Sequence, residues 1–272
     1  MNSTTPGRRY SGLTEASTCP GTATFSAKSY RNFEPAANLP YALWRFRVDA
    51  LIFDFDGVIV DSEPAHLAGF SEALRPMGIE LTKEQYCARY LGFDDYECFA
   101  VALRDHGKDF TQEQINQMVA HKTSVLKRKL AESILPVPGV VELIRAAATA
   151  EVPLAICSGA LREEIEIGAE TIGVRELFSV VIAAEDVHHS KPDPEGYRII
   201  PQRLTEATGK PVASEHCLAI EDSPMGITAA RGAGMKVLGL STTYRPEELI
   251  DADRIVKDFS QVTLESLREL VT

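Results

Sequence analysis

Asp49-Ala50-Leu51-Ile52-Phe53-Asp54-Phe55-Asp56-Gly57-Val58-Ile59-Val60-Asp61-Ser62 is the stretch that decides the fold. Its residues 50–53 are continuously apolar, as in a strand buried on both faces. Asp54 and Asp56 follow two positions apart, so on a strand both side chains point to the same face. Two such carboxylates are costly to bring together unless a cation or a proton-transfer role stabilises them. Gly57 then allows a sharp turn. Taken alone, the pair could simply cap a turn after a core strand.

The composition of the whole chain is that of a soluble globular protein with one or two domains. It has 272 residues, of which 44% are hydrophobic and 25% are charged. No apolar run approaches the ~20 residues that a membrane-spanning helix needs. The formal charge of −11 argues against nucleic acid or an anionic membrane as a partner.

The cysteines of the chain are odd in number, widely scattered and never arranged as C-x-x-C: Cys19, Cys87, Cys98, Cys157 and Cys217. This pattern argues against a disulfide framework or a zinc site and indicates a reducing compartment. It therefore predicts a cytoplasmic protein, and we expect a monomer.

Residues 1–47 differ from the rest of the chain in charge and in periodicity. They are basic, rich in Ser, Thr, Pro and Gly, and have no sustained helical or strand period. Such a segment cannot bury enough apolar surface to order itself well. We interpret it as a disordered extension, or as an artefact of a start codon placed too far upstream. The alternative is an organelle transit peptide, because such peptides contain Arg and Ser and few acids. The fold is expected to begin at residue 48.

Residues 63–135 are predicted to form a small, all-helical cap domain inserted directly after the first strand. Thr82-x-x-Gln85 and Thr111-x-x-Gln114 have the pattern of capping boxes at helix starts. No strand pattern interrupts this block. The expected helices are 63–74, 83–90, 95–106 and 112–131.

Residues 136–272 alternate between strand and helix patterns and, with residues 48–62, are predicted to form the catalytic core. The expected strands are 153–157, 178–183, 217–220, 236–240 and 254–256, and the expected helices are 139–150, 161–172, 194–208, 225–232 and 264–271. Alternation of this kind predicts an α/β fold with an open, Rossmann-like parallel sheet and helices on both faces.

Polar residues follow four of the expected strands. Asp54 and Asp56 follow the first strand, Ser158 and Gly159 the second, and Glu221 and Asp222 the fourth, whereas Lys191 lies in the loop after the third. Ligands of open parallel sheets bind beyond the carboxyl ends of the strands. We therefore expect these side chains to meet at one edge of the sheet.

This set of residues suits a metal-assisted phosphoryl transfer. Several carboxylates at one edge require a hard cation, and Mg²⁺ prefers carboxylates, carbonyls and water. A bound Mg²⁺ with Lys191 and Ser158 would neutralise the oxygens of a phosphoryl group. One aspartate can attack phosphorus, and the other can donate a proton to the leaving oxygen.

Four motifs carry a family resemblance. Asp54-x-Asp56-Gly57-x-x-x-Asp61-Ser62, Ser158-Gly159, Lys191-Pro192 and Glu221-Asp222-Ser223-x-x-Gly226 resemble, in order, the motifs of the haloacid dehalogenase-like hydrolase superfamily. With Asp61-Ser62-Glu63-x-x-His66 and the helical insertion, the chain looks like the β-phosphoglucomutase and phosphoglycolate phosphatase branch. The resemblance covers residues 48–272, and all four motifs in order make it specific.

The resemblance implies a role for each matching residue. Asp54 would be the nucleophile and Asp56 the general acid and base, while Ser158, Gly159 and Lys191 would contact the phosphoryl group. Mg²⁺ would be held by the Asp54 carboxylate, the Asp56 main-chain carbonyl and Asp222, with Glu221 as a further ligand or as a residue that orients them. The helical block would be a mobile cap that excludes water and selects the substrate.

The leading hypothesis is a Mg²⁺-dependent phosphatase that acts on a small phosphorylated metabolite, such as a sugar phosphate or phosphoglycolate, through an aspartyl phosphate. The alternative enzyme is a phosphosugar mutase of the β-phosphoglucomutase type. Gly159-Ala160-Leu161 argue against it, because similar mutases have polar phosphate-binding residues there and the nearest cation here is Arg162. The non-enzyme alternative is a phosphoacceptor signalling domain, although such domains have no helical cap. Asp56 argues against dehalogenase chemistry, because displacing a halide needs no proton donor.

Two further groups of charged residues lie in the helical block. Lys122, Lys127, Arg128 and Lys129 are interpreted first as a solvated helix face and, as the alternative, as a second phosphate contact. Asp94 and Asp95 lie where the family's substrate-specifying loop is expected. Unpaired acids there would oppose a heavily anionic substrate. His66 is expected close to the start of the cap, either near the site or as a partly exposed helix residue.

Overall fold

A computed structural model describes residues 48–91, 93–132 and 134–271. The interpretation of residues 1–47 as an extension or a transit peptide concerns a segment that lies outside the described residues.

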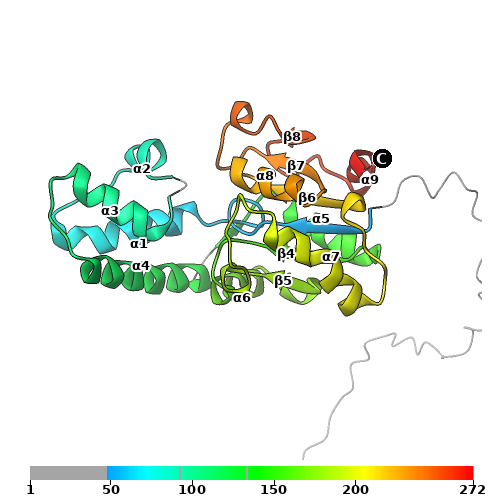
Figure 1. Cartoon of the computed structure of the whole chain (residues 1–272), viewed down its shortest axis with the longest axis horizontal. Coiled ribbons are helices and arrows are strands. Elements are labelled where there is room, and N and C mark those ends of the chain that lie inside the picture. The colour runs from blue at the N-terminus through cyan, green and yellow to red at the C-terminus, as the bar shows by residue number, and fades with distance from the viewer. Residues whose placement is uncertain (1–47, 92, 133, 272) are drawn as a thin grey trace, which may run out of the picture. The chain divides into compact units, whose positions relative to one another are not determined.

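A six-stranded parallel sheet forms the centre of the described fold (Figure 1). Its strand order is β5-β4-β1-β6-β7-β8, with bounds Ala50–Phe53 (β1), Leu154–Cys157 (β4), Val180–Ile182 (β5), Cys217–Glu221 (β6), Lys236–Leu240 (β7) and Arg254–Val256 (β8). The apolar stretch quoted above forms β1, which pairs with β4 on one side and β6 on the other. The predicted α/β fold with an open parallel sheet is confirmed.

Helices cover both faces of this sheet, as the strand sequences require. Along β1, Leu51 and Phe53 pack into one apolar cluster, and Ala50 and Ile52 pack into another, because successive side chains on a strand point to opposite faces. The first cluster includes residues of α5 (Val140–Thr149), α6 (Arg162–Thr171) and α9 (Leu264–Arg268), and the second includes residues of α7 (Glu195–Thr208) and α8 (Pro224–Gly232). Because the side chains on both faces of β1 are apolar, the strand is buried on both sides.

Short 3₁₀ helices occupy several connections of the described chain: Arg75–Met77, Arg175–Leu177, Ala184–Asp186, Ser214–His216, Pro246–Glu248 and Glu269–Val271. The last of these continues α9, so the closing helix expected at 264–271 is an α-helix only up to Arg268. The helix expected at 194–208 begins one residue later, at Glu195, and Pro194 occupies its N-cap position.

Residues 63–132 fold into α1 (Glu63–Leu74), α2 (Lys83–Arg89), α3 (Asp95–Asp105) and α4 (Gln112–Glu132) (Figure 1). Both predicted capping boxes are present, since the Thr82 and Thr111 hydroxyls accept main-chain N–H groups and Gln85 and Gln114 return the hydrogen bonds. These helices enclose an apolar cluster of their own around Phe70. The second half of α4 instead packs on the sheet's cluster, and the assignment of 63–135 as a separate cap domain stays a prediction.

Within the described part of the chain, no helix combines the length and the apolar character that crossing a membrane requires.

A second, two-stranded sheet joins the helical block to the core, and the sequence did not predict it. β2 (Val60–Asp61) and β3 (Leu135–Pro136) pair antiparallel. They lie where the chain enters and leaves the helical block. The main-chain N–H of Val137 also donates to the Ile59 carbonyl at 3.0 Å. The two connections are thus held together where they leave the core.

Candidate active site

Asp54 directly follows β1 and lies between the two strands that flank it. The residue is only 8% exposed. One carboxylate oxygen, Oδ1, accepts the main-chain N–H of Phe55 at 2.7 Å and lies 3.0 Å from Nζ of Lys191. The main-chain N–H of Asp54 donates to Ile220 of β6. The carboxylate is thereby held at the carboxyl end of the sheet.

Lys191 reaches the same place from the loop that precedes α7. Its Nζ donates to Glu221 Oε1 at 2.6 Å and to the Cys157 carbonyl at 3.0 Å, besides its contact with Asp54. These three partners stand at the ends of β6, β4 and β1, which are neighbours in the sheet. One lysine therefore links the carboxyl ends of three adjacent strands.

Glu221 is the last residue of β6, where the sequence led us to expect Ile220 as the strand end. It is wholly buried. Besides Lys191, its carboxylate accepts the Tyr197 hydroxyl at 2.6 Å and the Ser223 hydroxyl at 3.2 Å. A Cβ atom on Gly226 would lie 1.9 Å from Glu221 Oε2, so any larger residue at this position of the motif would clash with the Glu221 carboxylate.

Asp222 lies next to the turn that follows β1. Gly57 in that turn has a φ of 71°, and a Cβ atom there would lie 1.9 Å from Asp222 Oδ2. Ligand atoms of Asp54, Glu221 and Asp222 all lie within 4.8 Å of one another, and all three residues are buried. The structure therefore brings together the acidic residues that the sequence placed at two different strand ends.

The electrostatics of this cluster favour a bound cation. Burial raises the pKa of Asp54 to about 7, Lys191 counteracts this, and the charges of Glu221 and Asp56 add to it. Burial and the charges of Asp54 and Glu221 likewise raise the pKa of Asp222. Burial would lower the pKa of Lys191, but the two carboxylates it contacts raise it, so the lysine stays charged. A divalent cation would offset the remaining negative charge.

Asp56 stands apart from this cluster and has partners of its own. Its Oδ1 accepts the Ser62 hydroxyl, and Nε2 of His66 in α1 lies 3.8 Å away. Burial acts to raise its pKa, but the hydrogen bond and charge of His66 and the hydrogen bond of Ser62 outweigh burial and lower it. His66 is therefore beside the site. Its neighbours therefore hold Asp56 as a charged carboxylate, which suits the proton-accepting half of a general acid and base.

Ser158 and Gly159 directly follow β4, whose last residue, Cys157, accepts a hydrogen bond from Lys191. Ser158 is buried, and its hydroxyl oxygen accepts the main-chain N–H of Ala160 at 3.1 Å. Both residues line a small cavity together with Lys191 and Tyr197. A Cβ atom on Gly159 would meet open space, so this glycine borders a gap and not a packed neighbour.

Arg162 does not face this site. Its guanidinium binds the Asp186 carboxylate and the Val181 carbonyl, beside β5. The sequence suggested it as a cation near the phosphoryl group, because it is close to Ser158 along the chain. The direction of its side chain depends on Asp186, 24 residues further on, and is invisible in the local pattern.

The charged residues of the helical block are also arranged differently from the expectation. Lys122 is only 3% exposed, and its Nζ donates to Asp95 at 2.8 Å and lies 5.1 Å above the Phe70 ring. Asp94 caps α3 by accepting the main-chain N–H of Glu97. Interpreting Lys122 as part of a solvated face was therefore wrong. Asp95 is a paired acid, so it does not oppose an anionic substrate as a free charge would.

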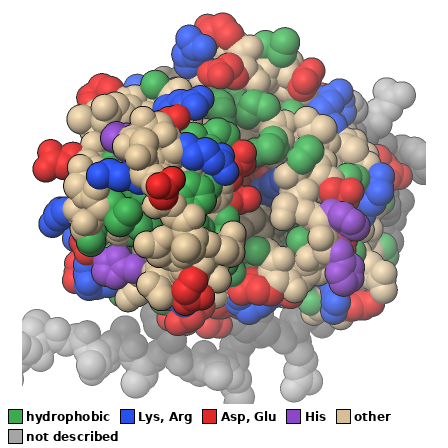
Figure 2. All heavy atoms as spheres, turned by 60° about the vertical axis from the view of Figure 1, so that its left-hand side comes forward, with side chains coloured by type: hydrophobic (Ala, Val, Ile, Leu, Met, Phe, Trp, Pro, Cys, Tyr) green, Lys and Arg blue, Asp and Glu red, His purple; other side chains and the backbone are tan. Residues whose placement is uncertain are grey.

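The rest of the basic cluster fits the solvated-face interpretation. Lys127 pairs with Glu163, and Arg128 pairs with Glu72. On the face of the molecule in Figure 2, acidic and basic side chains are interspersed and do not form one continuous basic area. That face therefore lacks the continuous basic patch that is typical of a nucleic-acid-binding surface.

Comparison with known proteins gives a match to the family model described as haloacid dehalogenase-like hydrolase, over residues 51–240. Among curated proteins, the chain is similar to validoxylamine A 7'-phosphate phosphatase of Streptomyces hygroscopicus subsp. limoneus. The two share 29% identity over 78% of this chain and 94% of that protein. It is also 29% identical to fructose-1-phosphate phosphatase YqaB of Escherichia coli K12, over 70% of this chain and 94% of that protein.

Among solved structures, the chain resembles CbbY from Rhodobacter sphaeroides in complex with phosphate. The TM-score is 0.71 with 29% identity, over 81% of this chain and 99% of that chain. The resemblance drawn from the four motifs is confirmed by these matches, which extend over the core and the helical block alike.

Proposed function

Because this chain belongs to the haloacid dehalogenase-like hydrolase family, we propose that it is a Mg²⁺-dependent phosphatase of a small phosphorylated metabolite, of the sugar phosphate or phosphoglycolate type. The observation that carries the proposal is the cluster in which Lys191 joins Asp54 and Glu221 next to Asp222. The similarity to proteins named as phosphatases of validoxylamine A 7'-phosphate and fructose 1-phosphate supports it.

Asp54, Asp222 and the main-chain carbonyl of Asp56 would hold Mg²⁺. Glu221 contributes charge and orients Lys191, because its Oε1 already binds that lysine and Tyr197. The metal would neutralise charge on the phosphoryl oxygens and on the attacking carboxylate. The buried carboxylates fit this role, because burial and mutual repulsion raise the pKa of Asp54 and of Asp222 and a bound cation would stabilise their charged forms.

The chain's own residues then carry two displacements at phosphorus. The Asp54 carboxylate attacks, and as the bond from phosphorus to the leaving oxygen breaks, Asp56 donates its proton to that oxygen. Water then attacks the aspartyl phosphate, Asp56 takes the proton from it, and Asp54 is released with inorganic phosphate. Lys191, Ser158 and Gly159 bind the phosphoryl oxygens in both steps.

Residues 63–135 would act as a cap over this site. His66 reaches Asp56 from the first helix of the block, so the block and the chemistry are in direct contact. The pairing of β2 with β3 makes the two connections one joint, about which the helices could open and close.

We expect Mg²⁺ to be required for activity and to stabilise the protein. The purified chain should release inorganic phosphate from part of a panel of sugar phosphates and phosphoglycolate with Mg²⁺, and should lose that activity in EDTA. Mg²⁺ should also raise the melting temperature, because it binds only the folded cluster.

In Asp222→Asn the shift of the melting temperature by Mg²⁺ should shrink, which tests metal binding without turnover. Undiminished phosphate release in EDTA would contradict the metal assignment.

The phosphosugar mutase alternative requires cations for two phosphates at once. Lys191 is paired at the reacting carboxylate, Asp54, whereas Lys122, Arg162 and the remaining basic residues of the cap helix are paired with carboxylates elsewhere. Lys122 binds Asp95 at 2.8 Å, and Arg162 binds Asp186. A second phosphate would have to displace one of these carboxylates, which favours hydrolysis.

We therefore expect β-glucose 1-phosphate, where it is accepted, to yield glucose and inorganic phosphate. Phosphate release and a coupled glucose-6-phosphate dehydrogenase assay should be run in parallel, with a bisphosphate activator present. Faster formation of glucose 6-phosphate than of phosphate would favour the mutase.

A further inference from the structure

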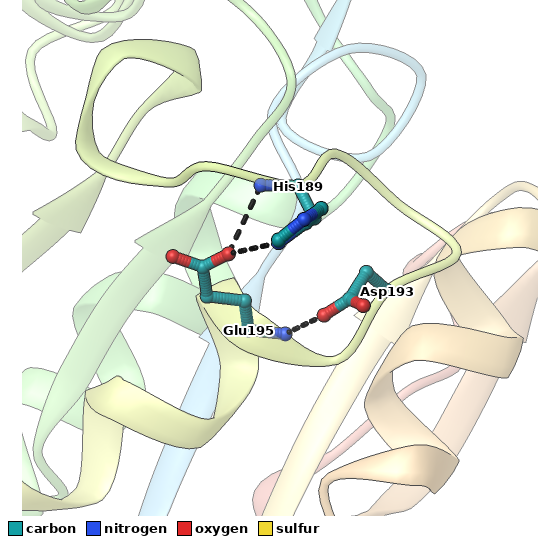
Figure 3. Close-up of side chains that lie close together, drawn as sticks. All are labelled: His189, Asp193 and Glu195. Carbon is teal, nitrogen blue, oxygen red and sulfur yellow. Dashed lines mark hydrogen bonds and ion pairs between the residues drawn. The ribbon is translucent and has the colours of Figure 1, made fainter.

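The loop that carries Lys191 is fastened to the first residue of the helix that follows it. Glu195 begins α7, and its carboxylate turns back over the loop (Figure 3). Oε1 accepts the main-chain N–H of His188 at 3.0 Å, and Oε2 accepts that of His189 at 2.9 Å. Oε2 also lies 3.1 Å from Nδ1 of His189. Both oxygens of one carboxylate therefore bind two successive residues just before Lys191.

The segment after Lys191 is held in the same way. Asp193 Oδ1 accepts the main-chain N–H of Glu195 at 2.9 Å (Figure 3). The main-chain N–H of Asp193 donates to the Ser190 carbonyl at 3.0 Å. Lys191 thus projects from a short loop that is closed by hydrogen bonds on both sides.

This closure matters because lysine is a flexible residue that must act at one place. Its long side chain loses much rotamer freedom when it is immobilised. Here the Lys191 side chain is only 17% exposed and bridges Asp54 and Glu221. When the main chain is already held in place, only the Lys191 side chain remains to be ordered. Accurate placement matters because small displacements of a catalytic group lower the rate strongly.

We propose that Glu195 is a positioning residue, whose carboxylate fixes the main chain of residues 188–189 so that Lys191 is kept in place for the phosphoryl group. This inference rests on the proposed function, because it requires Lys191 to act on the reacting phosphate. The hydrogen bonds of the Glu195 carboxylate are to the loop's main chain, so Glu195 acts on Lys191 through that main chain.

The same three side chains, His189, Asp193 and Glu195, could together hold a metal ion. Their existing hydrogen bonds favour the loop-fastening role instead. Both oxygens of Glu195 already accept main-chain N–H groups, and His189 is 73% exposed at its side chain. Main-chain hydrogen bonds, chiefly that from His188, lower the pKa of Glu195, so the carboxylate is charged at neutral pH.

The test is a set of variants assayed with Mg²⁺ and the best substrate of the panel. Glu195→Ala removes both acceptors and is expected to lower kcat/KM by about 10- to 100-fold. Glu195→Gln keeps one acceptor and should show a smaller loss.

The matched control for these variants is Asp253→Ala. The Asp253 carboxylate also accepts a main-chain N–H, that of Val237 at 2.9 Å, but near the amino end of β7. Asp253→Ala should lower the melting temperature at least as much as Glu195→Ala, yet leave kcat/KM within about twofold.

A double-mutant cycle separates positioning from general stability. In a Lys191→Met background, Glu195→Ala should cause little further loss of kcat/KM, because the group it positions is gone. Binding of inorganic phosphate, measured by calorimetry, needs no turnover; it should weaken in Glu195→Ala, and to the same extent in Lys191→Met and in the double variant.

Two results would overturn the proposal: wild-type kcat/KM in Glu195→Ala, or losses that multiply in the double variant. Wild-type activity of Lys191→Met would instead overturn the role of Lys191 in the proposed function, so the two failures are distinguishable.

Discussion

Asp54→Asn is expected to abolish phosphate release, lowering kcat by at least about 10³-fold, as removal of a covalent nucleophile does. An amide oxygen does not attack phosphorus at a useful rate. The fold should survive, because asparagine has nearly the same volume and its oxygen can still accept from Phe55 and Lys191. Burial raises the pKa of Asp54, which means that its charged form is unfavourable there. The substitution removes this charge and should therefore not destabilise the fold.

The matched control is Asp49→Asn, the same substitution at the other end of β1. Asp49 is also buried, and its carboxylate accepts the main-chain N–H of Ala213 at 3.2 Å. This variant should keep most of the activity, with both variants followed by circular dichroism and thermal melting. Asp54→Asn with more than a few per cent of the wild-type rate would refute the nucleophile assignment.

Gly57→Ala is expected to be strongly damaging, although glycine carries no functional group of its own. The new Cβ would lie 1.9 Å from Asp222 Oδ2 and 2.6 Å from Thr243 Oγ1, in a residue with φ of 71°. Backbone strain alone costs about 1 kcal/mol, and displacement of Asp222 would disrupt the acidic cluster. We expect an activity loss of at least about 100-fold, since small displacements in a site have such effects.

Gly78→Ala isolates the backbone contribution. Gly78 has the same φ of 71°, but a Cβ atom there would meet nothing within 4 Å. It should therefore lose stability by about 1 kcal/mol in urea unfolding and keep its activity. If Gly57→Ala and Gly78→Ala lost activity equally, or if Gly57→Ala stayed active, crowding of Asp222 would not be the reason why residue 57 must be glycine.

The core was predictable from the sequence because its signals are local. Residues 50–53 are apolar on both faces, and a strand of that kind is stable only between two layers of helices. Parallel strands also end at a common edge, so polar residues after several strands must converge there. For this reason Asp54, Lys191, Glu221 and Asp222 could be grouped before any distance was known.

Other features could be found only in the tertiary structure, because they depend on partners far along the chain. The strands β2 and β3 have two residues each, which is too short for any period, and they pair across the whole helical block. Lys122 and Arg162 looked like available cations, but their carboxylate partners come from other elements.

By itself, the sequence determined the layered fold, the edge of the sheet where the site lies and the residue types gathered there. The tertiary structure decided where each charge is paired: Lys191 at the carboxylate of Asp54, and Lys122 and Arg162 with carboxylates elsewhere. Burial and ion pairing are properties of neighbours, and the pattern along one helix or strand does not contain the neighbours from another. The carboxylate of Glu195, turned back on the loop of Lys191, shows this most directly.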